Sequence, residues 1–380
     1  MNILVINSGS SSLKYQLFKM PAKEPVCSGL VERIGEQGSA IADHGVALKQ
    51  VLAMLSEGEH PVIHSPDDIV AVGHRVVHGG EQFSGPTIID KAVKAQIRKL
   101  FSLAPLHNPA NYKCIEVAEE TFPNAKQIAV FDTAFHQTIP QQAYRYAIPE
   151  SYYTEHGIRV YGFHGTSHKY VSEQAMAWLG KPDAKLITIH LGNGCSMTAI
   201  NSGKSVDTTM GFGPLSGLMM GTRSGDIDPS VIFHLMEHAG YTLEQLSALL
   251  NKQSGLLGVG GSGDMRDIRK RLEQGDEKAK LALQLYAYRI KKFIGAYAAV
   301  LNGLDAIVFT AGVGENDVAM REAVCKELDY LGIILDEETN TRYKKELLEV
   351  NAVGSKVKIL VIPTNEEYEI ARQCMDFTVG

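Results

Sequence analysis

Two strand–turn–strand patterns, 183 residues apart, constrain the fold of this chain most strongly. At residues 3–6 an apolar run leads into the polar turn "NSGSSS", and residues 13–17 then alternate apolar and polar side chains, as a half-buried strand does. Residues 184–200, "AKLITIHLGNGCSMTAI", follow the same plan. Aligning "INSG" at 6–9 with "IHLG" at 189–192 gives an offset close to half of the 380 residues. We therefore predict two domains of related architecture.

Helical segments separate the expected strands. Apolar residues recur at helical spacing in residues 42–55, 91–103, 168–180, 241–252, 276–301 and 366–377. Strands alternating with such helices predict an α/β protein. The stretch "YAIPESYYTEHG" around Pro149 is the expected boundary between the two halves.

Composition excludes several classes of function. The chain is 44% hydrophobic and 21% charged, which is typical of a globular protein. Its formal net charge of -6 argues against a nucleic-acid partner or an anionic membrane surface. Five cysteines without a C-x-x-C pair predict neither a disulfide framework nor a zinc ribbon, and they fit a reducing compartment. With no signal-peptide pattern and no apolar stretch near the ~18 residues of a membrane span, we expect a cytoplasmic protein.

The first turn is unusually small and polar. It offers the amide of Asn7, the unhindered backbone of Gly9 and the hydroxyls of Ser8, Ser10, Ser11 and Ser12. These are also ordinary hairpin residues, so a plain turn and a phosphate cradle of N–H and hydroxyl groups remain equal alternatives. The turn does not match a Walker A loop or a dinucleotide-binding loop, because both of those open a helix.

Polar residues also follow other expected strands. Arg75 lies in "GHRVVHGG", Asp132 follows "AVF" and Glu366 follows "IPTN". The two carboxylates are candidates for holding a hard cation such as Mg²⁺, and Arg75 could bind an anion. The alternatives are that the carboxylates cap helices or turns and that Arg75 pairs with a carboxylate.

Three further stretches carry candidate chemistry. In "FHGTSH", His164 and His168 are four residues apart, but no third ligand accompanies them, so a helix start beside a polar cleft is favoured over zinc. In "GTRSGDIDP", Arg223 lies in a glycine-rich loop, where a merely solvated arginine is unexpected. "GSGDMRDI" and "TAGVGEN" could lie over a nucleotide, although Asp264 could equally cap a helix.

Nine motifs, taken in order, resemble the acetate kinase family from one end of the chain to the other. They are "NSGSSSLKYQLF", "GHRVVHGG", "LAPLHNPAN", "VFDTAFH", "YGFHGTSH", "HLGNGCS", "GTRSGDIDP", "TAGVGEN" and "IPTNEE". The resemblance implies the fold of the acetate and sugar kinase, Hsp70 and actin superfamily, in which two duplicated actin-like (ribonuclease H-like) domains surround a nucleotide cleft. It implies domains at 1–148, joined by the C-terminal helix 366–380, and at 149–365, in a homodimer.

The resemblance also implies a reaction and its residues. The γ-phosphoryl group of ATP is transferred in line and reversibly to acetate, giving acetyl phosphate and ADP, with Mg²⁺ as the cation and Mn²⁺ as its alternative. Carried over by motif, the catalytic set is His164, Arg223, Arg75, Asp132 and His107, in which His164 donates a hydrogen bond to the phosphoryl group. The implied metal ligands are Asn7, Asp132 and Glu366. The implied nucleotide and phosphate contacts are Ser10, Ser12, Lys14, His190, Gly192, Asn193, Gly194, Asp264, Met265, Arg266, Gly312, Val313, Gly314 and Asn316.

The family's apolar substrate pocket maps onto Val77, Leu106, Phe163 and Pro214, with Arg75 for the carboxylate. One methyl group in such a pocket is worth only ~1 to 3 kcal/mol, so a propionate or butyrate kinase is the alternative within this class. Gly213 and Ser216 depart from the family pattern at the pocket edge, and the loop at 258–265 and the segment at 36–43 look shortened. An ATP-hydrolysing switch is the alternative from another class, but it has no use for Arg75, Arg223 and a carboxylate pocket.

Overall fold

The chain folds into two compact units. The computed structural model describes residues 1–9, 11–36, 38–57, 61–105, 107–342 and 346–378. The first unit comprises residues 1–137, 165–167 and 365–380, and the second comprises 138–164 and 168–364. The chain therefore leaves the first unit and returns to it at its C-terminal end. No helix in the described ranges is long and apolar enough to cross a membrane.

The first unit is a six-stranded sheet with the strand order β3-β2-β1-β4-β6-β5. Its elements are β1 (Asn2–Ser8), β2 (Ser12–Lys19), β3 (Cys27–Glu32), α1 (His44–Ser56), η1 (Pro66–Asp68), β4 (Ile69–Val76), β5 (Thr87–Ile88), α2 (Lys91–Lys99), η2 (Leu100–Ser102), α3 (Asn108–Thr121), β6 (Lys126–Phe131) and α15 (Glu366–Met375). The short helix η3 (Ala134–Thr138) follows β6.

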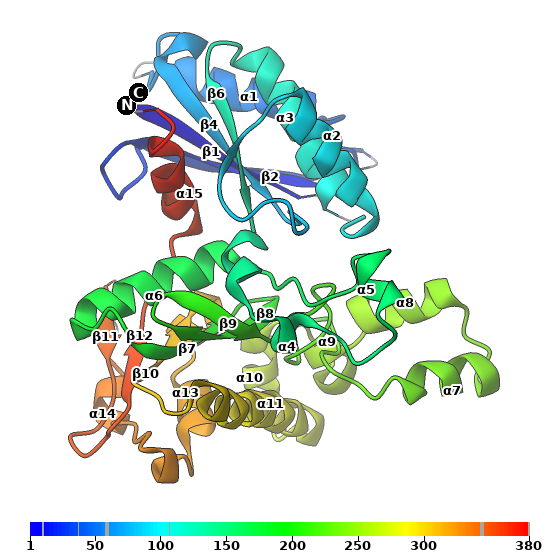
Figure 1. Ribbon diagram of the computed structural model, residues 1–380, viewed down its shortest axis with the longest axis vertical. Helices are drawn as coiled ribbons and strands as arrows, with labels where there is room; N and C mark the ends of the chain where they lie inside the picture. The colour runs from blue at the N-terminus through cyan, green and yellow to red at the C-terminus, as the bar shows by residue number, and fades with distance from the viewer. Residues whose placement is uncertain (10, 37, 58–60, 106, 343–345, 379–380) are drawn as a thin grey trace. The chain divides into compact units, whose positions relative to one another are not determined.

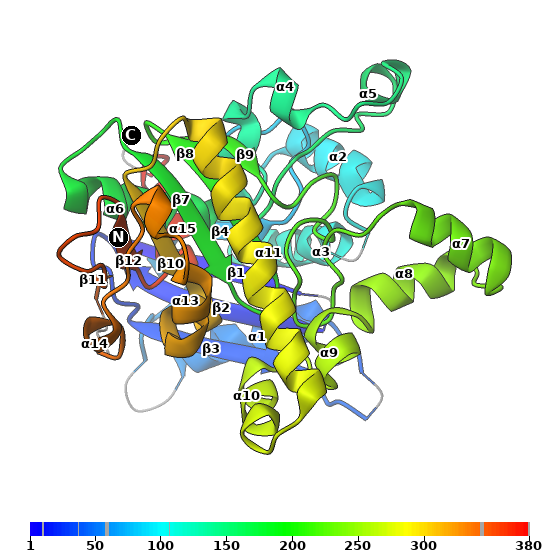
Figure 2. The same cartoon turned by 90° about the horizontal axis from the view of Figure 1, so that it is seen from below.

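The second unit is also a six-stranded sheet, with the order β11-β12-β10-β7-β8-β9. Its elements are α4 (Gln141–Tyr144), α5 (Ser151–Thr154), α6 (Gly165–Leu179), β7 (Lys185–Leu191), β8 (Cys195–Asn201), β9 (Lys204–Thr208), α7 (Ser230–His238), α8 (Leu243–Lys252), α9 (Gly255–Gly260), α10 (Met265–Glu273), α11 (Glu277–Leu301), β10 (Ala306–Thr310), α12 (Ala311–Asn316), α13 (Val318–Cys325), η4 (Asp329–Leu331), α14 (Glu337–Asn340), β11 (Leu348–Glu349) and β12 (Lys358–Val361). The long helix α11 packs across β7 and β8 (Figure 2).

The two sheets share one topology. In each, an antiparallel three-stranded meander is followed by two parallel strands, and a short antiparallel strand forms the far edge. Strands β1 and β7 are both seven residues long, and they end at Ser8 and Leu191, which the sequence alignment also pairs. The predicted α/β fold of two similar domains is confirmed.

Burial on both faces explains why residues 3–6 are continuously apolar. Leu4 and Ile6 belong to the cluster that α1 and α3 complete on one face. Helix α15 packs on β1 and β4 (Figure 1). There Gly73 of β4 leaves room for α15, because a Cβ at Gly73 would lie 2.7 Å from Ile370 and Cys374. A strand that is covered on both faces carries no polar alternation.

We predict that Gly73→Ala destabilises the first unit by about 1–3 kcal/mol, because the added methyl group overpacks the sheet against α15. Gly295→Ala is the matched control: Gly295 lies inside α11, and a Cβ there meets nothing within 4 Å. The control should stabilise its helix by up to about 1 kcal/mol. Urea unfolding of the two variants measures the difference, and equal midpoints would contradict this account of the packing.

Candidate active site

Three parallel strands of the first unit end beside one another. Strand β4 lies between β1 and β6, with Ile6 opposite His74 and Arg75 opposite Val130. The residues at and just beyond these ends, among them Asn7, Arg75 and Asp132, therefore meet at one edge of the sheet. This edge is the usual place for a ligand site in an open α/β sheet.

Arg75 and Asp132 form a two-pronged ion pair. Arg75 Nε donates to Asp132 Oδ1 at 2.9 Å, and Nη2 donates to Oδ2 at 2.7 Å. Burial alone would lower the pKa of Arg75, but the nearby carboxylates of Asp132 and Glu366 raise it above its usual value. The guanidinium is therefore permanently charged and held in one orientation, and Nη1 is not used by Asp132.

Glu366 is placed differently from Asp132. It is the first residue of α15, and its Oε2 lies 3.8 Å from Arg75 Nη2. This oxygen is buried and has no hydrogen-bond partner in the described part of the chain. Burial raises the pKa of Glu366, and Asp132 and Glu367 add to the effect against the opposing charges of Arg75 and Lys14. A buried carboxylate oxygen without a hydrogen-bond partner suits a hard cation.

Asn108 and Asn111 support this edge, although no sequence pattern singled them out as site residues. Asn111 accepts a hydrogen bond from Val77 N at 3.2 Å and donates to Ser8 O at 2.7 Å. Asn108 accepts from His78 N at 3.0 Å and donates to His78 O at 2.9 Å. Two buried amides at the start of α3 thus tie the loop after β4 to the end of β1. Their spacing in "HNPAN", on one face of a helix start, is the signal that could have found them.

The second unit has its own polar turn after β7, where Gly192 N donates to Gly194 O at 3.1 Å. A Cβ at Gly194 would lie 3.5 Å from His164 Nε2 and 3.6 Å from Arg223 Nη1. The turn therefore has an imidazole nitrogen and a guanidinium group close to one backbone position. Both groups can donate hydrogen bonds to an anion.

His164 is fixed from two sides. Its backbone has φ 56°, an uncommon conformation for a residue with a side chain, immediately before α6. Its Nδ1 lies 2.9 Å from Ser196 Oγ, and its ring stacks on His190 with centroids 4.3 Å apart. His168, its neighbour in "FHGTSH", uses both ring nitrogens on the hydroxyls of Thr188 and Ser196. Zinc is therefore not supported at this pair, and no group of three or more His, Cys, Asp or Glu residues within the described ranges could hold a metal ion.

Arg223 is held by the glycine-rich loop. Its Nη1 donates to Pro214 O at 3.1 Å. Burial lowers the pKa of Arg223, although an arginine remains protonated at neutral pH. Gly221 in the same loop approaches Asn193 closely, since a Cβ at Gly221 would lie 2.3 Å from Asn193 Oδ1. The loop and the turn after β7 therefore pack directly on each other.

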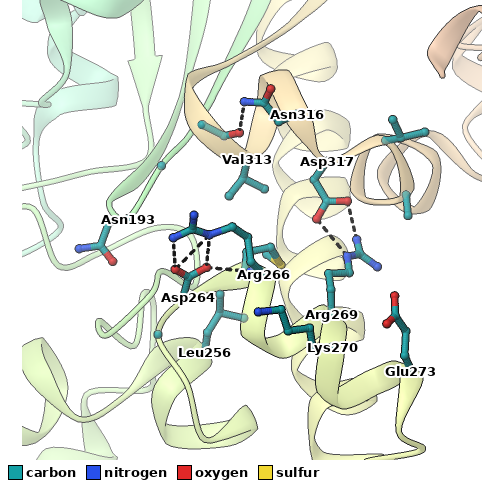
Figure 3. A pocket seen from close by; sticks show the side chains of 16 residues that line it. Asn193, Leu256, Asp264, Arg266, Arg269, Lys270, Glu273, Val313, Asn316 and Asp317 are labelled. Atoms are coloured by element: carbon teal, nitrogen blue, oxygen red, sulfur yellow. Dashed lines mark hydrogen bonds and ion pairs between the residues drawn. The ribbon is translucent and has the colours of Figure 1, made fainter. Parts of the chain in front are cut away.

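A pocket of about 1120 Å³ lies in the second unit (Figure 3). Eight expected nucleotide contacts line it, namely Gly192, Asn193, Asp264, Met265, Arg266, Gly312, Val313 and Asn316. The structure adds Leu256, Gly263, Arg269, Lys270, Glu273, Asp317, Val318 and Ala319. The volume is that of a site for a ligand as large as a nucleotide.

Ion pairs shape the walls of the pocket. Asp264 caps α10 by accepting from Arg266 N at 2.8 Å, and its carboxylate also accepts from the Arg266 side chain. These hydrogen bonds lower the pKa of Asp264 to about 2. Further along α10, Arg269 pairs with Asp317 at 2.8 and 3.0 Å (Figure 3). Asp264 therefore caps α10, as one of the two alternatives from the sequence predicted, and it also lines the pocket.

The remaining expected residues lie in several places. Ser10 and Leu106 are outside the described residues. Lys14 pairs with Glu367 at 2.6 Å, Ser12 opens β2, and His107 directly precedes α3. Val77 belongs to the first unit, whereas Phe163 and Pro214 belong to the second. Gly314 is not in the pocket lining, and a Cβ there would lie 3.4 Å from Phe309 C. A Cβ at Gly213 would meet nothing within 4 Å, and Ser216 Oγ accepts from Gly211 N at 2.8 Å inside its own turn.

Comparisons with known proteins identify the family. The model of the acetokinase family matches residues 2–372. The chain belongs to the acetokinase family. It is 57% identical to an acetate kinase of Flavobacterium johnsoniae, with 98% of each chain covered. It is 50% identical to an acetate kinase of Carboxydothermus hydrogenoformans, with 100% of each covered.

Solved structures agree with this assignment. An acetate kinase of Porphyromonas gingivalis superposes with a TM-score of 0.94 at 44% identity, with 99% of each chain covered. A propionate kinase of Francisella tularensis superposes with a TM-score of 0.92 at 42% identity, with 98% of each covered. The resemblance stated from the nine motifs is confirmed. The fold does not by itself separate acetate from propionate.

Proposed function

We propose that this member of the acetokinase family is an acetate kinase, which transfers the γ-phosphoryl group of ATP to acetate and gives acetyl phosphate and ADP. The observation that carries the proposal is the turn after β7. Gly192 and Asn193 line the large pocket, and Gly194 next to them lies beside His164 Nε2 and Arg223 Nη1. A nucleotide in the pocket would thus have two hydrogen-bond donors near its phosphates.

The reaction needs charge neutralisation more than a base. Acetate has a pKa of ~4 to 5, so its oxygen is already ionised at neutral pH and can attack directly. The enzyme has to bring two anions together and stabilise charge in the transition state. Arg75 is the proposed carboxylate ligand, because Asp132 fixes its orientation through Nε and Nη2 and does not use Nη1. Arg223 and His164 are the proposed ligands of the transferring phosphoryl group.

The residues of the first unit fit a magnesium ion. Magnesium is usually held by one or two carboxylates together with phosphate oxygens. The Oε2 atom of Glu366 supports a direct role because it is buried without a hydrogen-bond partner among the described residues, whereas both oxygens of Asp132 accept from Arg75. Glu366 is therefore the proposed carboxylate ligand of the metal, Asn7 is a second proposed ligand from the family resemblance, and Asp132 is the residue that orients Arg75. When bound, the cation neutralises phosphate charge; Mn²⁺ is a proposed substitute.

The proposed preference for acetate over longer carboxylic acids depends on few residues. Val77 lies two residues after Arg75, and Pro214 O accepts a hydrogen bond from Arg223. We propose that these two apolar residues favour the two-carbon acid. The name of the propionate kinase of Francisella tularensis shows that a relative of the same fold takes a longer acid. Propionate is therefore the second candidate substrate.

Hydroxylamine trapping of acyl phosphate tests the proposed reaction. Folded protein with ATP, Mg²⁺ and acetate should form acetyl hydroxamate, with a higher kcat/KM for acetate than for propionate or butyrate. If no short acid yields a hydroxamate, the proposal is wrong. ATP turnover that is unaffected by added acid would instead support a nucleotide-driven switch.

We predict that Arg223→Ala lowers kcat by about 100-fold or more while the Kd for ATP changes by about threefold or less, because the lost donor acts on charge in the transition state. Arg289→Ala is the control, since Arg289 is exposed at this hydrogen bond and donates to Asp226 O in the same unit. Isothermal titration and the hydroxamate assay measure the two quantities. Equal losses in ATP binding and turnover would contradict the assigned role.

We predict that Glu366→Gln weakens binding of Mn²⁺ with ADP by about tenfold or more, measured by electron paramagnetic resonance without turnover, because an anionic ligand is lost. In the parent chain the pKa of Glu366 is raised, so metal binding should fall as the pH drops towards that pKa and the carboxylate takes up a proton. Glu119→Gln is the control, since Glu119 pairs with Lys94 elsewhere in the first unit. Unchanged Mn²⁺ binding in the Glu366 variant would remove it from the metal site.

We also propose a homodimer, as the family resemblance implies, in the cytoplasm, as the cysteine content indicates. Helix α7 has no buried residue and exposes Val231, Phe233 and Met236, and it lies away from the sheet of the second unit in both views (Figures 1 and 2). Light scattering should give twice the chain mass of 41.5 kDa. Phe233→Glu should shift the mass towards the monomer, whereas Val353→Glu, at an exposed apolar position elsewhere, should not. A monomeric parent chain would contradict this.

A further inference from the structure

A chain of buried hydrogen bonds lies behind His164. His164 Nδ1 is 2.9 Å from Ser196 Oγ, and the same oxygen is 2.7 Å from His168 Nε2. His168 Nδ1 is 2.7 Å from Thr188 Oγ1. Ser196, His168 and Thr188 are fully buried. Three side chains that the assigned reaction does not use thus connect the core of the second unit to its proposed phosphoryl ligand.

Local structure aligns the four side chains. His164 and His168 are joined through the first turn of α6, where His168 N donates to His164 O at 3.0 Å. Thr188 lies on β7 and Ser196 on β8, and the register pairs Ser196 with His190, whose ring stacks on His164. The chain of contacts therefore rests on a helix and two central strands and has little freedom to rearrange.

Ser196 makes the protonation of the two rings interdependent. Its hydroxyl has one proton and stands between two ring nitrogens, so it donates to one ring and accepts from the other. While both rings are neutral, the donors in this series of hydrogen bonds can therefore point in only two directions, towards His164 or away from it. The tautomer of His168 determines the tautomer of His164, because each neutral imidazole has one N–H and one acceptor nitrogen.

We propose that Thr188, His168 and Ser196 are positioning residues that hold His164 as the tautomer with its proton on Nε2. This inference rests on the proposed role of His164 towards the phosphoryl group. Phosphoryl oxygens only accept hydrogen bonds, and Nε2 is the nitrogen beside Gly194, so Nε2 has to carry the proton. His164 Nδ1 then accepts from Ser196, Ser196 accepts from His168 Nε2, and His168 Nδ1 accepts from the hydroxyl of Thr188.

Because the hydrogen bonds all point in one direction, Thr188 affects the tautomer of His164 through His168 and Ser196. Without its hydroxyl, His168 Nδ1 loses its donor, and the preference for the Nε2 proton on both rings weakens. The ring of His164 keeps its place between Ser196 and His190, but it presents a donor to the phosphoryl group for only part of the time. We expect kcat to fall and the KM values to stay nearly unchanged, because a wrong tautomer affects the transition state.

Thr188→Val, with nearly the same shape, tests the inference. We expect kcat to fall by ~10- to 100-fold, the range typical of losing an outer orienting partner, with KM values for ATP and acetate within about twofold. Two-bond ¹⁵N–¹H correlation spectra of the rings should show Nε2-protonated His164 and His168 in the parent chain and mixed tautomers in the variant. Thr188→Ser, which keeps the hydroxyl, should recover most of both losses.

Thr198→Val is the matched control. Thr198 lies opposite Thr188 in the sheet, and its hydroxyl bonds to that of Thr208 at 3.0 Å, outside the chain of contacts. It should leave kcat and both tautomers unchanged. If Thr188→Val does not fold, Ser196→Ala interrupts the same chain and is read by the same spectra.

Two results overturn the inference: a parent chain in which His164 carries its proton on Nδ1, or variants with parent-like tautomers and kcat. A parent chain that forms no acyl phosphate overturns the proposed function instead. The ring spectra of that chain still report the tautomers, so the two failures are distinguishable.

Discussion

In both units, three parallel strands end at the same edge of a sheet, and this constraint places Asn7, Arg75 and Asp132 in the first unit and the turn at Gly192 in the second. In the first unit the edge gathers the ends of β1, β4 and β6, and in the second it gathers those of β7, β10 and β12. Polar groups collected in this way are partly buried, and each needs a partner. Arg75 with Asp132, and Asn111 with Ser8 and Val77, meet that need in the first unit. His164 with Ser196 meets it in the second.

The sequence predicted the fold well because the duplication is visible in its pattern. The apolar runs that end at Ile6 and Ile189 are strands covered on both faces, and the small turns after them can only be hairpins. The same pattern located the turn at Gly192, whereas the pocket residues from Asp264 to Arg266 came from the stretch "GSGDMRDI" and the family resemblance. Whether "NSGSSS" is a phosphate cradle stays a prediction: the structure shows a hairpin in which Gly9 N donates to Ser12 O at 2.8 Å, and Ser10 is outside the described residues.

Other parts of the site could not be read from the sequence because they depend on contacts between distant residues. Ser196 appears in the sequence as an ordinary strand residue, and only the fold brings it between His164, which precedes α6, and His168 within α6. Asn111 lies 103 positions from the Ser8 carbonyl that it binds. The pair of Arg269 and Asp317 joins α10 to the start of α13. Hydrogen-bond partners of this kind follow from tertiary packing, which no local pattern encodes.

The charges at the first edge are consistent with the proposed metal ion. Glu366 experiences the charges of Arg75, Asp132, Glu367 and Lys14. With its own carboxylate, the group has two positive and three negative members, a net charge of -1 when all are ionised. Such a group would repel both acetate and the phosphates. One divalent cation on Glu366 changes the balance to +1, so the same carboxylates that orient Arg75 in the free protein would attract anions once the metal is bound.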